Sequence, residues 1–197
     1  MVSRSSHAYV IGLVGKAGSG KSTVARILVE EYHFDLISLD EVGHHALELS
    51  RDELIHVFGQ QIVGPDGTIQ RAVLGQIVFG NMDMLLTLNA ITHPRIKELV
   101  KQQLSNMRTH TLLDGALLYE IGLAPLCDFI LMVDAPEAMI MERLIRQRKW
   151  PEEKAKSVLF SQRHLQFLRE EADFIIFNND SLEKIERQVE FFVHTIS

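Results

Sequence analysis

Residues 15–22 read Gly-Lys-Ala-Gly-Ser-Gly-Lys-Ser and fit the pattern Gly-x-x-x-x-Gly-Lys-Ser/Thr. An apolar run precedes this stretch at residues 8–14, and a helical pattern follows it at residues 22–32. In this setting glycines let backbone N–H groups turn inward and form an anion-binding cradle at the start of a helix. The stretch therefore predicts a phosphate-binding loop, and a glycine-rich turn without a ligand is the alternative.

The second half of this loop is expected to hold a nucleotide. Lys21 is predicted to reach the β- and γ-phosphates, and Ser22 to offer its hydroxyl group to Mg²⁺. The predicted nucleotide-binding residues of the loop are Gly18, Ser19, Gly20, Lys21, Ser22 and Thr23.

Short apolar runs alternate with longer helical patterns along the chain. The candidate strands lie at residues 8–14, 34–39, 111–113, 128–133 and 172–177. They are apolar at mostly consecutive positions, as strands buried on both faces are. Helical spacing is found mainly at residues 22–32, 137–149 and 182–193. This alternation predicts an α/β fold, a three-layer core with a five-stranded parallel sheet and right-handed crossovers.

Two segments are longer than simple crossovers require. The first, residues 41–109, is mostly helical and contains a turn signal, Gly-Pro-Asp-Gly, at residues 64–67. The second, residues 143–171, is rich in charge and contains a helix start, Trp-Pro-Glu-Glu, at residues 150–153. We expect one domain over 1–197 with these two attachments, its core formed by residues 8–40, 110–142 and 172–197.

The composition is that of a globular protein. Of 197 residues, 46% are hydrophobic and 23% charged, which excludes collagen-like and disordered chains. Because the chain has 20 basic and 26 acidic residues, a nucleic-acid partner is not expected. Cys127 is the single cysteine, which fits a reducing compartment and reads as a small buried side chain. No apolar run reaches the ~18 residues of a membrane span, so we expect a cytoplasmic protein without a membrane partner.

The phosphate loop alone does not choose among GTPases, ATPases and kinases. The tetrapeptide Asn-Lys-x-Asp, which guanine recognition usually requires, does not occur in the sequence. The run at residues 111–113 ends in one carboxylate, Asp114, where many ATPases that use water as acceptor have an acidic pair. A kinase needs a lobe for its second substrate and a lid over the phosphates. Residues 41–109 and 143–171 can supply these parts, which favours a kinase.

Further short motifs follow one another in a characteristic order. They are Asp40 after the second strand, Phe58-Gly59, Asp66-Gly67-x-x-Gln70-Arg71, Val78-Phe79, Leu88-Asn89-x-Ile91-x-His93-Pro94-x-Ile96, Leu117-Leu118-Tyr119-Glu120 and Ala172-Asp173-x-x-Ile176-x-Asn178. None is specific alone, but together, over residues 9–189, they resemble the dephospho-coenzyme A kinase family.

The resemblance implies a P-loop nucleoside-kinase-like core with a helical substrate-binding lobe and a helical lid. It implies transfer of the γ-phosphoryl group of ATP to the ribose 3′-hydroxyl of dephospho-coenzyme A, the last step of coenzyme A synthesis. ATP and dephospho-coenzyme A would be the small-molecule partners, and Mg²⁺ the cofactor. Two alternatives remain open: a kinase for another small hydroxyl acceptor, such as a nucleoside, and a non-catalytic nucleotide-binding regulator.

The resemblance assigns four residues to the acceptor. Asp40 matches the proposed base that contacts the acceptor hydroxyl, although it could also be a helix N-cap before Glu41. Arg71 matches an arginine that can clamp an anionic group, or it forms a surface salt bridge. His93 is expected to line the acceptor pocket, or to be structural. Glu120 is the fourth expected acceptor residue.

Two residues are assigned to the nucleotide side. Asp114 resembles a partner of Mg²⁺ that acts through water, and a turn-forming aspartate before Gly115 is the alternative. Asn178 matches a residue near the adenine, and a turn residue at the end of a strand is the alternative.

Arginines mark the start of the predicted lid. Arg143 matches the family's lid arginine, which would stabilise the transferring phosphoryl group, and it completes the expected catalytic set of Lys21, Asp40 and Arg143. The family's second arginine would stand at Gln147, so that Arg146, Arg148 or neither takes its part. The chain also departs from the family pattern at Lys16, Ser38, His44 and Gln70, which leaves the acceptor contacts near His44 open.

Overall fold

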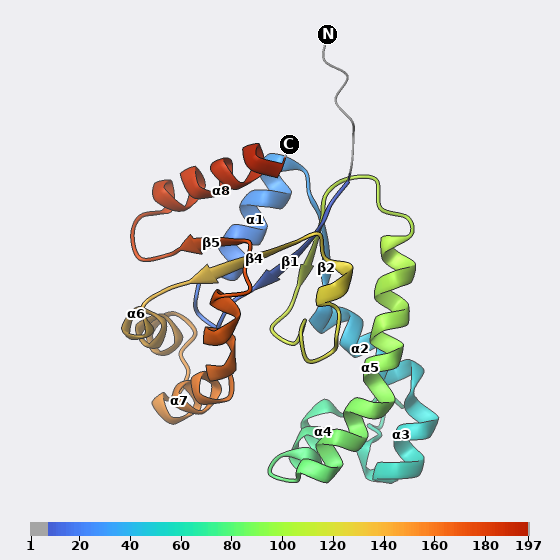
Figure 1. Cartoon of the computed structure of the whole chain (residues 1–197). Coiled ribbons are helices and arrows are strands. Elements are labelled where there is room, and N and C mark those ends of the chain that lie inside the picture. The colour runs from blue at the N-terminus through green and yellow to red at the C-terminus, as the bar shows by residue number, and fades with distance from the viewer. Residues whose placement is uncertain (1–7, 197) are drawn as a thin grey trace. The chain divides into compact units, whose positions relative to one another are not determined.

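The computed structural model describes residues 8–196 (Figure 1). The chain forms two compact units. We call residues up to Ile37 and from Met107 onward the core unit, and Ser38–Asn106 the helical unit.

The core unit is built on a five-stranded sheet in the order β2-β3-β1-β4-β5. The strands are β1 (Val10–Val14), β2 (Asp35–Ser38), β3 (Thr111–Asp114), β4 (Phe129–Asp134) and β5 (Phe174–Phe177). The pairs β1–β3, β1–β4 and β4–β5 are parallel. The predicted α/β fold with five strands is confirmed, and every strand lies within two residues of its predicted start.

The helices of the core unit are α1 (Lys21–Tyr32), α6 (Glu137–Glu142), α7 (Glu152–Ser161) and α8 (Leu182–Ile196). The short 3₁₀ helices η2 (Ala124–Leu126) and η4 (Arg163–Arg169) complete them. The prediction of one helix over residues 137–149 is wrong in its second half, because Arg143–Gln147 form a π-helical turn, η3. Wide turns of this kind are common at functional sites, and this one carries Arg143.

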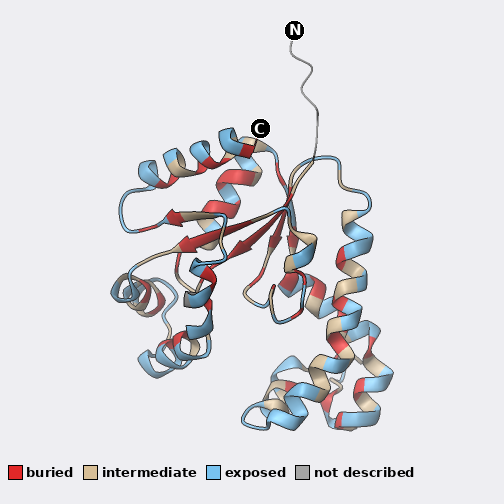
Figure 2. Ribbon diagram, viewed as in Figure 1, coloured by how far each residue is buried: buried red, intermediate tan, exposed pale blue. Residues whose placement is uncertain are grey.

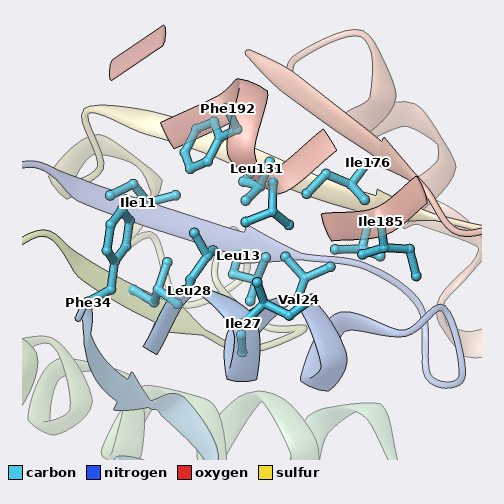
Figure 3. Close-up of a cluster of buried hydrophobic side chains, with 14 of the residues drawn as sticks. Ile11, Leu13, Val24, Ile27, Leu28, Phe34, Leu131, Ile176, Ile185 and Phe192 are labelled. Carbon is cyan, nitrogen blue, oxygen red and sulfur yellow. The ribbon is translucent and has the colours of Figure 1, made fainter. Parts of the chain in front are cut away.

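The main hydrophobic core joins β1, β4 and β5 to α1 and α8. Ile11 and Leu13 of β1 are fully buried against Leu28 of α1 and Phe192 of α8 (Figure 3). Buried residues dominate the central strands, whereas α8 is exposed on its outer side (Figure 2). On the opposite face of β1, a Cβ atom at Gly12 would lie 2.8 Å from Ile130 Cδ1. A larger residue there would make the neighbouring side chains shift.

Three strands begin directly after a side chain that caps the neighbouring strand. His110 Nδ1 accepts from Tyr9 N at 3.1 Å, and Asp128 Oδ2 accepts from Val10 N at 2.8 Å. Asp173 Oδ2 accepts from Ile130 N at 2.7 Å. Backbone N–H groups at the end of a sheet need acceptors, so these side chains set where β3, β4 and β5 begin. Two of the predicted strands started too early because they included Asp128 and Asp173.

The helical unit consists of α2 (Leu39–Leu49), α3 (Arg51–Phe58), η1 (Gln60–Ile62), α4 (Arg71–Val78) and α5 (Met82–Leu104). Its core contains Leu54, Phe58, Ile62, Ile69 and Leu74. A turn at residues 64–67 joins η1 to α4, as predicted. Asp66 accepts from both the N and Oγ1 atoms of Thr68, and these hydrogen bonds lower the pKa of Asp66.

Burial lowers the pKa of His110 below its ordinary value of 6.5, so the unfolded chain binds this proton more readily than the folded chain. The contribution of His110 to stability is therefore present above the ordinary value and is lost as the pH falls below it. We predict that the Tm falls more between about pH 7.5 and 5.5 in the native protein than in His110→Gln. Glutamine keeps an acceptor for Tyr9 N but does not titrate.

The control for this titration is His56→Gln, because His56 is exposed on α3. Its Tm should follow the native pH dependence. An identical fall in the Tm of all three proteins would contradict the assignment to His110.

Candidate active site

The carboxyl ends of parallel strands meet at one edge of the sheet in the core unit. The phosphate loop follows β1, Asp114 is the last residue of β3, and Asn178 follows β5. Open α/β sheets bind ligands beyond this edge. The fold thus gathers here the predicted nucleotide-binding residues that are far apart in the sequence.

The phosphate loop presents backbone donors that the protein leaves open. Helix α1 begins after Gly20 without a side-chain cap. Within residues 8–196, no protein acceptor pairs with the N–H groups of Gly18, Gly20, Lys21 and Ser22. Uncapped N–H groups at the start of a helix bind anions. The side chains of Ser22 and Thr23 lie in the first turn of the same helix.

Lys21 and Asp114 form an ion pair beside these donors. Both side chains are only 19% exposed. Asp114 therefore has a partner within the predicted site, which a purely turn-forming aspartate would not need. The pair places one cation and one carboxylate next to the open N–H groups.

Asn178 connects the phosphate loop to the end of β5 through hydrogen bonds. It is 6% exposed, and its Nδ2 atom donates to Ser19 O at 2.7 Å. Its backbone N donates to Asp134 O at 2.7 Å, as a residue at the end of a strand does. Gly20 has a φ of 100°, and a Cβ atom there would overlap the Asn178 amide. Both backbone conformation and packing thus require glycine at position 20.

Arg143 holds the same loop from the π-helical turn. Its Nη1 atom donates to Gly18 O at 3.3 Å and to Ser19 O at 3.4 Å. Its Nη2 atom donates to Asn178 O at 3.2 Å and to Asn178 Oδ1 at 3.0 Å. Arg143 therefore lies at the predicted nucleotide site, with its guanidinium group bound to the carbonyl side of the loop.

The other two lid arginines have different partners. Arg146 is 78% exposed and pairs with Glu142 at 3.1 Å on its own helical segment. The guanidinium carbon of Arg148 lies 5.7 Å from the ring centre of Trp150. Neither contact involves the phosphate loop.

Three predicted acceptor residues belong to the helical unit. Asp40 is exposed in the first turn of α2, and the cap of this helix is Ser38, whose Oγ accepts from Glu41 N at 3.3 Å. The alternative that Asp40 is the N-cap is therefore wrong. Arg71 is exposed at the start of α4, and His93 is half-buried on α5.

Sequence reasoning missed several polar contacts of the core unit. Glu120, the fourth predicted acceptor residue, pairs with Nε2 of His164 at 2.6 Å. Asp134 lies 3.5 Å from Arg169, and Gln162 accepts a hydrogen bond from the loop. His164, Arg169 and Gln162 follow no motif in the sequence, so only tertiary structure could bring them to notice.

The side chains at this edge of the sheet that could bind a metal ion have oxygen ligands. The Ser22 hydroxyl and the Asp114 carboxylate are hard oxygen ligands of the kind Mg²⁺ prefers. No cluster of three or more His, Cys, Asp or Glu side chains suited to a metal occurs among the described residues. Burial raises the pKa of Cys127 to about 12, which keeps its thiol protonated. In the described part of the chain, no helix has the length and apolar character needed to cross a membrane.

A parallel sheet with a nucleotide-phosphate loop after its first strand and two further helical segments defines a P-loop kinase. The profile of the dephospho-CoA kinase family matches residues 9–184. A dephospho-CoA kinase of Carboxydothermus hydrogenoformans is 35% identical over 191 residues, which are 91% of this chain and 90% of that protein. The chain belongs to the dephospho-CoA kinase family.

Solved structures agree with this assignment. TT1252 from Thermus thermophilus has a TM-score of 0.85 and 29% identity, covering 97% of this chain and 99% of its own. The dephospho-CoA kinase from Campylobacter jejuni has a TM-score of 0.65 and 25% identity, covering 96% of this chain and 98% of its own. The resemblance seen in the sequence motifs is thus confirmed.

We predict that Asn178→Ala destabilises the core unit by about 1–3 kcal/mol, because it removes the buried hydrogen bond from Nδ2 to Ser19 O and the one that Oδ1 accepts from Arg143. The loop then loses its anchor to β5, and ATP binding should weaken as well. Chemical denaturation and calorimetric titration with ATP measure the two effects. Asn179→Ala is the matched control, because Asn179 is adjacent and exposed. Equal stability of the two variants would contradict the anchoring role.

Proposed function

We propose that this chain transfers the γ-phosphoryl group of ATP to the ribose 3′-hydroxyl of dephospho-coenzyme A, giving coenzyme A and ADP. The observation that carries the proposal is the set of open N–H groups at the start of α1, next to Lys21. Membership of the dephospho-CoA kinase family supports the choice of acceptor. Residues 41–109 would hold the acceptor, and residues 143–171 would form the lid.

The phosphate side of the reaction follows from the loop. The open N–H groups would bind the β- and γ-phosphates, and Lys21 would exchange its contact with Asp114 for a phosphate oxygen. Arg143 would keep the loop in shape and add positive charge beside it. Asn178 would lie next to the adenine.

The oxygen ligands at the phosphate side suit Mg²⁺. Ser22 and Asp114 would hold Mg²⁺, Asp114 through water, and the ion would neutralise charge on the phosphates.

The acceptor side requires a base. We assign this role to Asp40. Its carboxylate would take the proton of the 3′-hydroxyl group while the hydroxyl oxygen attacks the γ-phosphorus. The bond from that phosphorus to the β–γ bridging oxygen breaks, and its electron pair leaves with ADP. Arg71, His93 and Glu120 would bind and orient the acceptor. We place this reaction in the cytoplasm, with no nucleic-acid or membrane partner.

Purified protein with ATP and Mg²⁺ should phosphorylate dephospho-coenzyme A, and Lys21→Ala should abolish this turnover. The variant removes the cation that contacts the transferring group, while the sheet and α1 remain. Coupled ADP release measures turnover, and circular dichroism checks the fold. Lys101→Ala, at an exposed position of α5, should keep the native rate. A native protein that consumes no ATP with this acceptor, but does so with a nucleoside, would replace the proposed substrate.

Asp40→Asn should lower kcat by about 10²- to 10⁴-fold with ATP affinity near that of the native protein, because only the base is lost. Asp52→Asn is a matched control, since Asp52 is also exposed and also in the first turn of its helix. Both variants lose a similar favourable charge at a helix start. If both lowered kcat equally, or neither did, Asp40 would not be the base.

A further inference from the structure

The third residue of the phosphate loop donates its N–H group to a side chain far away in the sequence. Ala17 N donates to Oε1 of Gln162 at 2.8 Å, across 145 residues. Gln162 lies between the end of α7 and the start of η4. Because only the amide oxygen can accept from a backbone N–H, the contact also sets which way the amide faces.

The other N–H groups of the loop have different partners or none among the described residues. Ser19 N is paired inside the loop, with Lys16 O at 3.0 Å. The N–H groups at the start of α1 have no acceptor in the described part of the chain. Ala17 is therefore the loop residue, among those described, whose N–H is held by another segment.

Apolar packing brings the same two segments together. Ala17 packs against a buried cluster of Ile140, Leu144, Ala155 and Leu159, from α6, η3 and α7. Hydrophobic contact is non-directional. It holds Ala17 near α7 but does not orient its peptide group, and the bond to Gln162 supplies that orientation.

We propose that Gln162 is a positioning residue for phosphoryl transfer, which orients the phosphate loop through Ala17 and couples it to the end of α7. The inference rests on the proposed kinase reaction. Phosphoryl-transfer catalysis is mostly positioning and charge stabilisation, so a small rotation of the loop should lower the rate. A glutamine orients the N–H without placing a negative charge beside the phosphates, whereas a glutamate would repel them.

The decisive variant is Gln162→Met, which keeps the length of the side chain and removes the acceptor. We expect kcat/KM for ATP to fall by about 3- to 10-fold, with KM for the acceptor unchanged. Faster hydrogen exchange at the Ala17 amide should accompany this loss. Gln103→Met, the same replacement at an exposed position of α5, should leave all these quantities unchanged. Native kinetics in Gln162→Met, or unchanged exchange at Ala17, overturns the proposal.

A second variant, Gln162→Glu, tests whether Gln162 orients the loop for ATP binding or only holds it in place. This variant keeps an acceptor for Ala17 N, so we expect native thermal stability. We expect it to bind ATP more weakly than Gln162→Met does, because its charge repels the phosphates, and we expect salt to restore part of the affinity by screening that charge. Trp150 is the single tryptophan and packs on the same cluster, so its fluorescence can follow ATP binding without an acceptor. Native ATP affinity in Gln162→Glu would reduce Gln162 to a fastening role and overturn the proposal. Failure to phosphorylate dephospho-coenzyme A would count only against the proposed function.

Discussion

Among the described residues, the phosphate loop leaves several backbone N–H groups without a protein acceptor, and the core unit is organised around that constraint. An unpaired N–H group costs free energy when it is shielded from water. Such a loop stays in one conformation only if other atoms hold it. Here the carbonyl oxygens of Gly18 and Ser19 are bound by Arg143, and Ser19 O also by Asn178. The donors thus stay free for phosphate because the acceptors of the same loop are occupied.

The position of Arg143 changes how a lid arginine is understood in this chain. The sequence predicts a helix over residues 137–149, with Arg143 at the phosphates and with Arg146, Arg148 or neither as a second arginine. Instead, a π-helical turn directs Arg143 to the loop and to Asn178, while Arg146 pairs with Glu142. The guanidinium group of Arg143 therefore lies against the carbonyl oxygens of the phosphate loop.

Much of the fold could be predicted because its signals are local. The apolar runs located all five strands, and the loop pattern located the start of α1. The starts of β4 and β5 were predicted one and two residues too early, because the capping contacts of Asp128 and Asp173 with the neighbouring strand are visible only in the tertiary structure. Lys21, Asp114 and Asn178, which the structure brings to the same edge of the sheet, were predicted as site residues from motifs. Gln162 was missed because its partner, Ala17, is 145 residues away.

The sequence by itself determined the α/β class, the phosphate loop and the family, since each rests on residue types at short, regular spacings. Tertiary structure alone decided which side chains hold that loop. Arg143, Gln162 and Asn178 reach it from three different segments, and hydrogen bonds between distant segments leave no periodic trace in a sequence. It also decided that Ser38, and not Asp40, caps α2, because a cap is defined by the hydroxyl that faces Glu41 N.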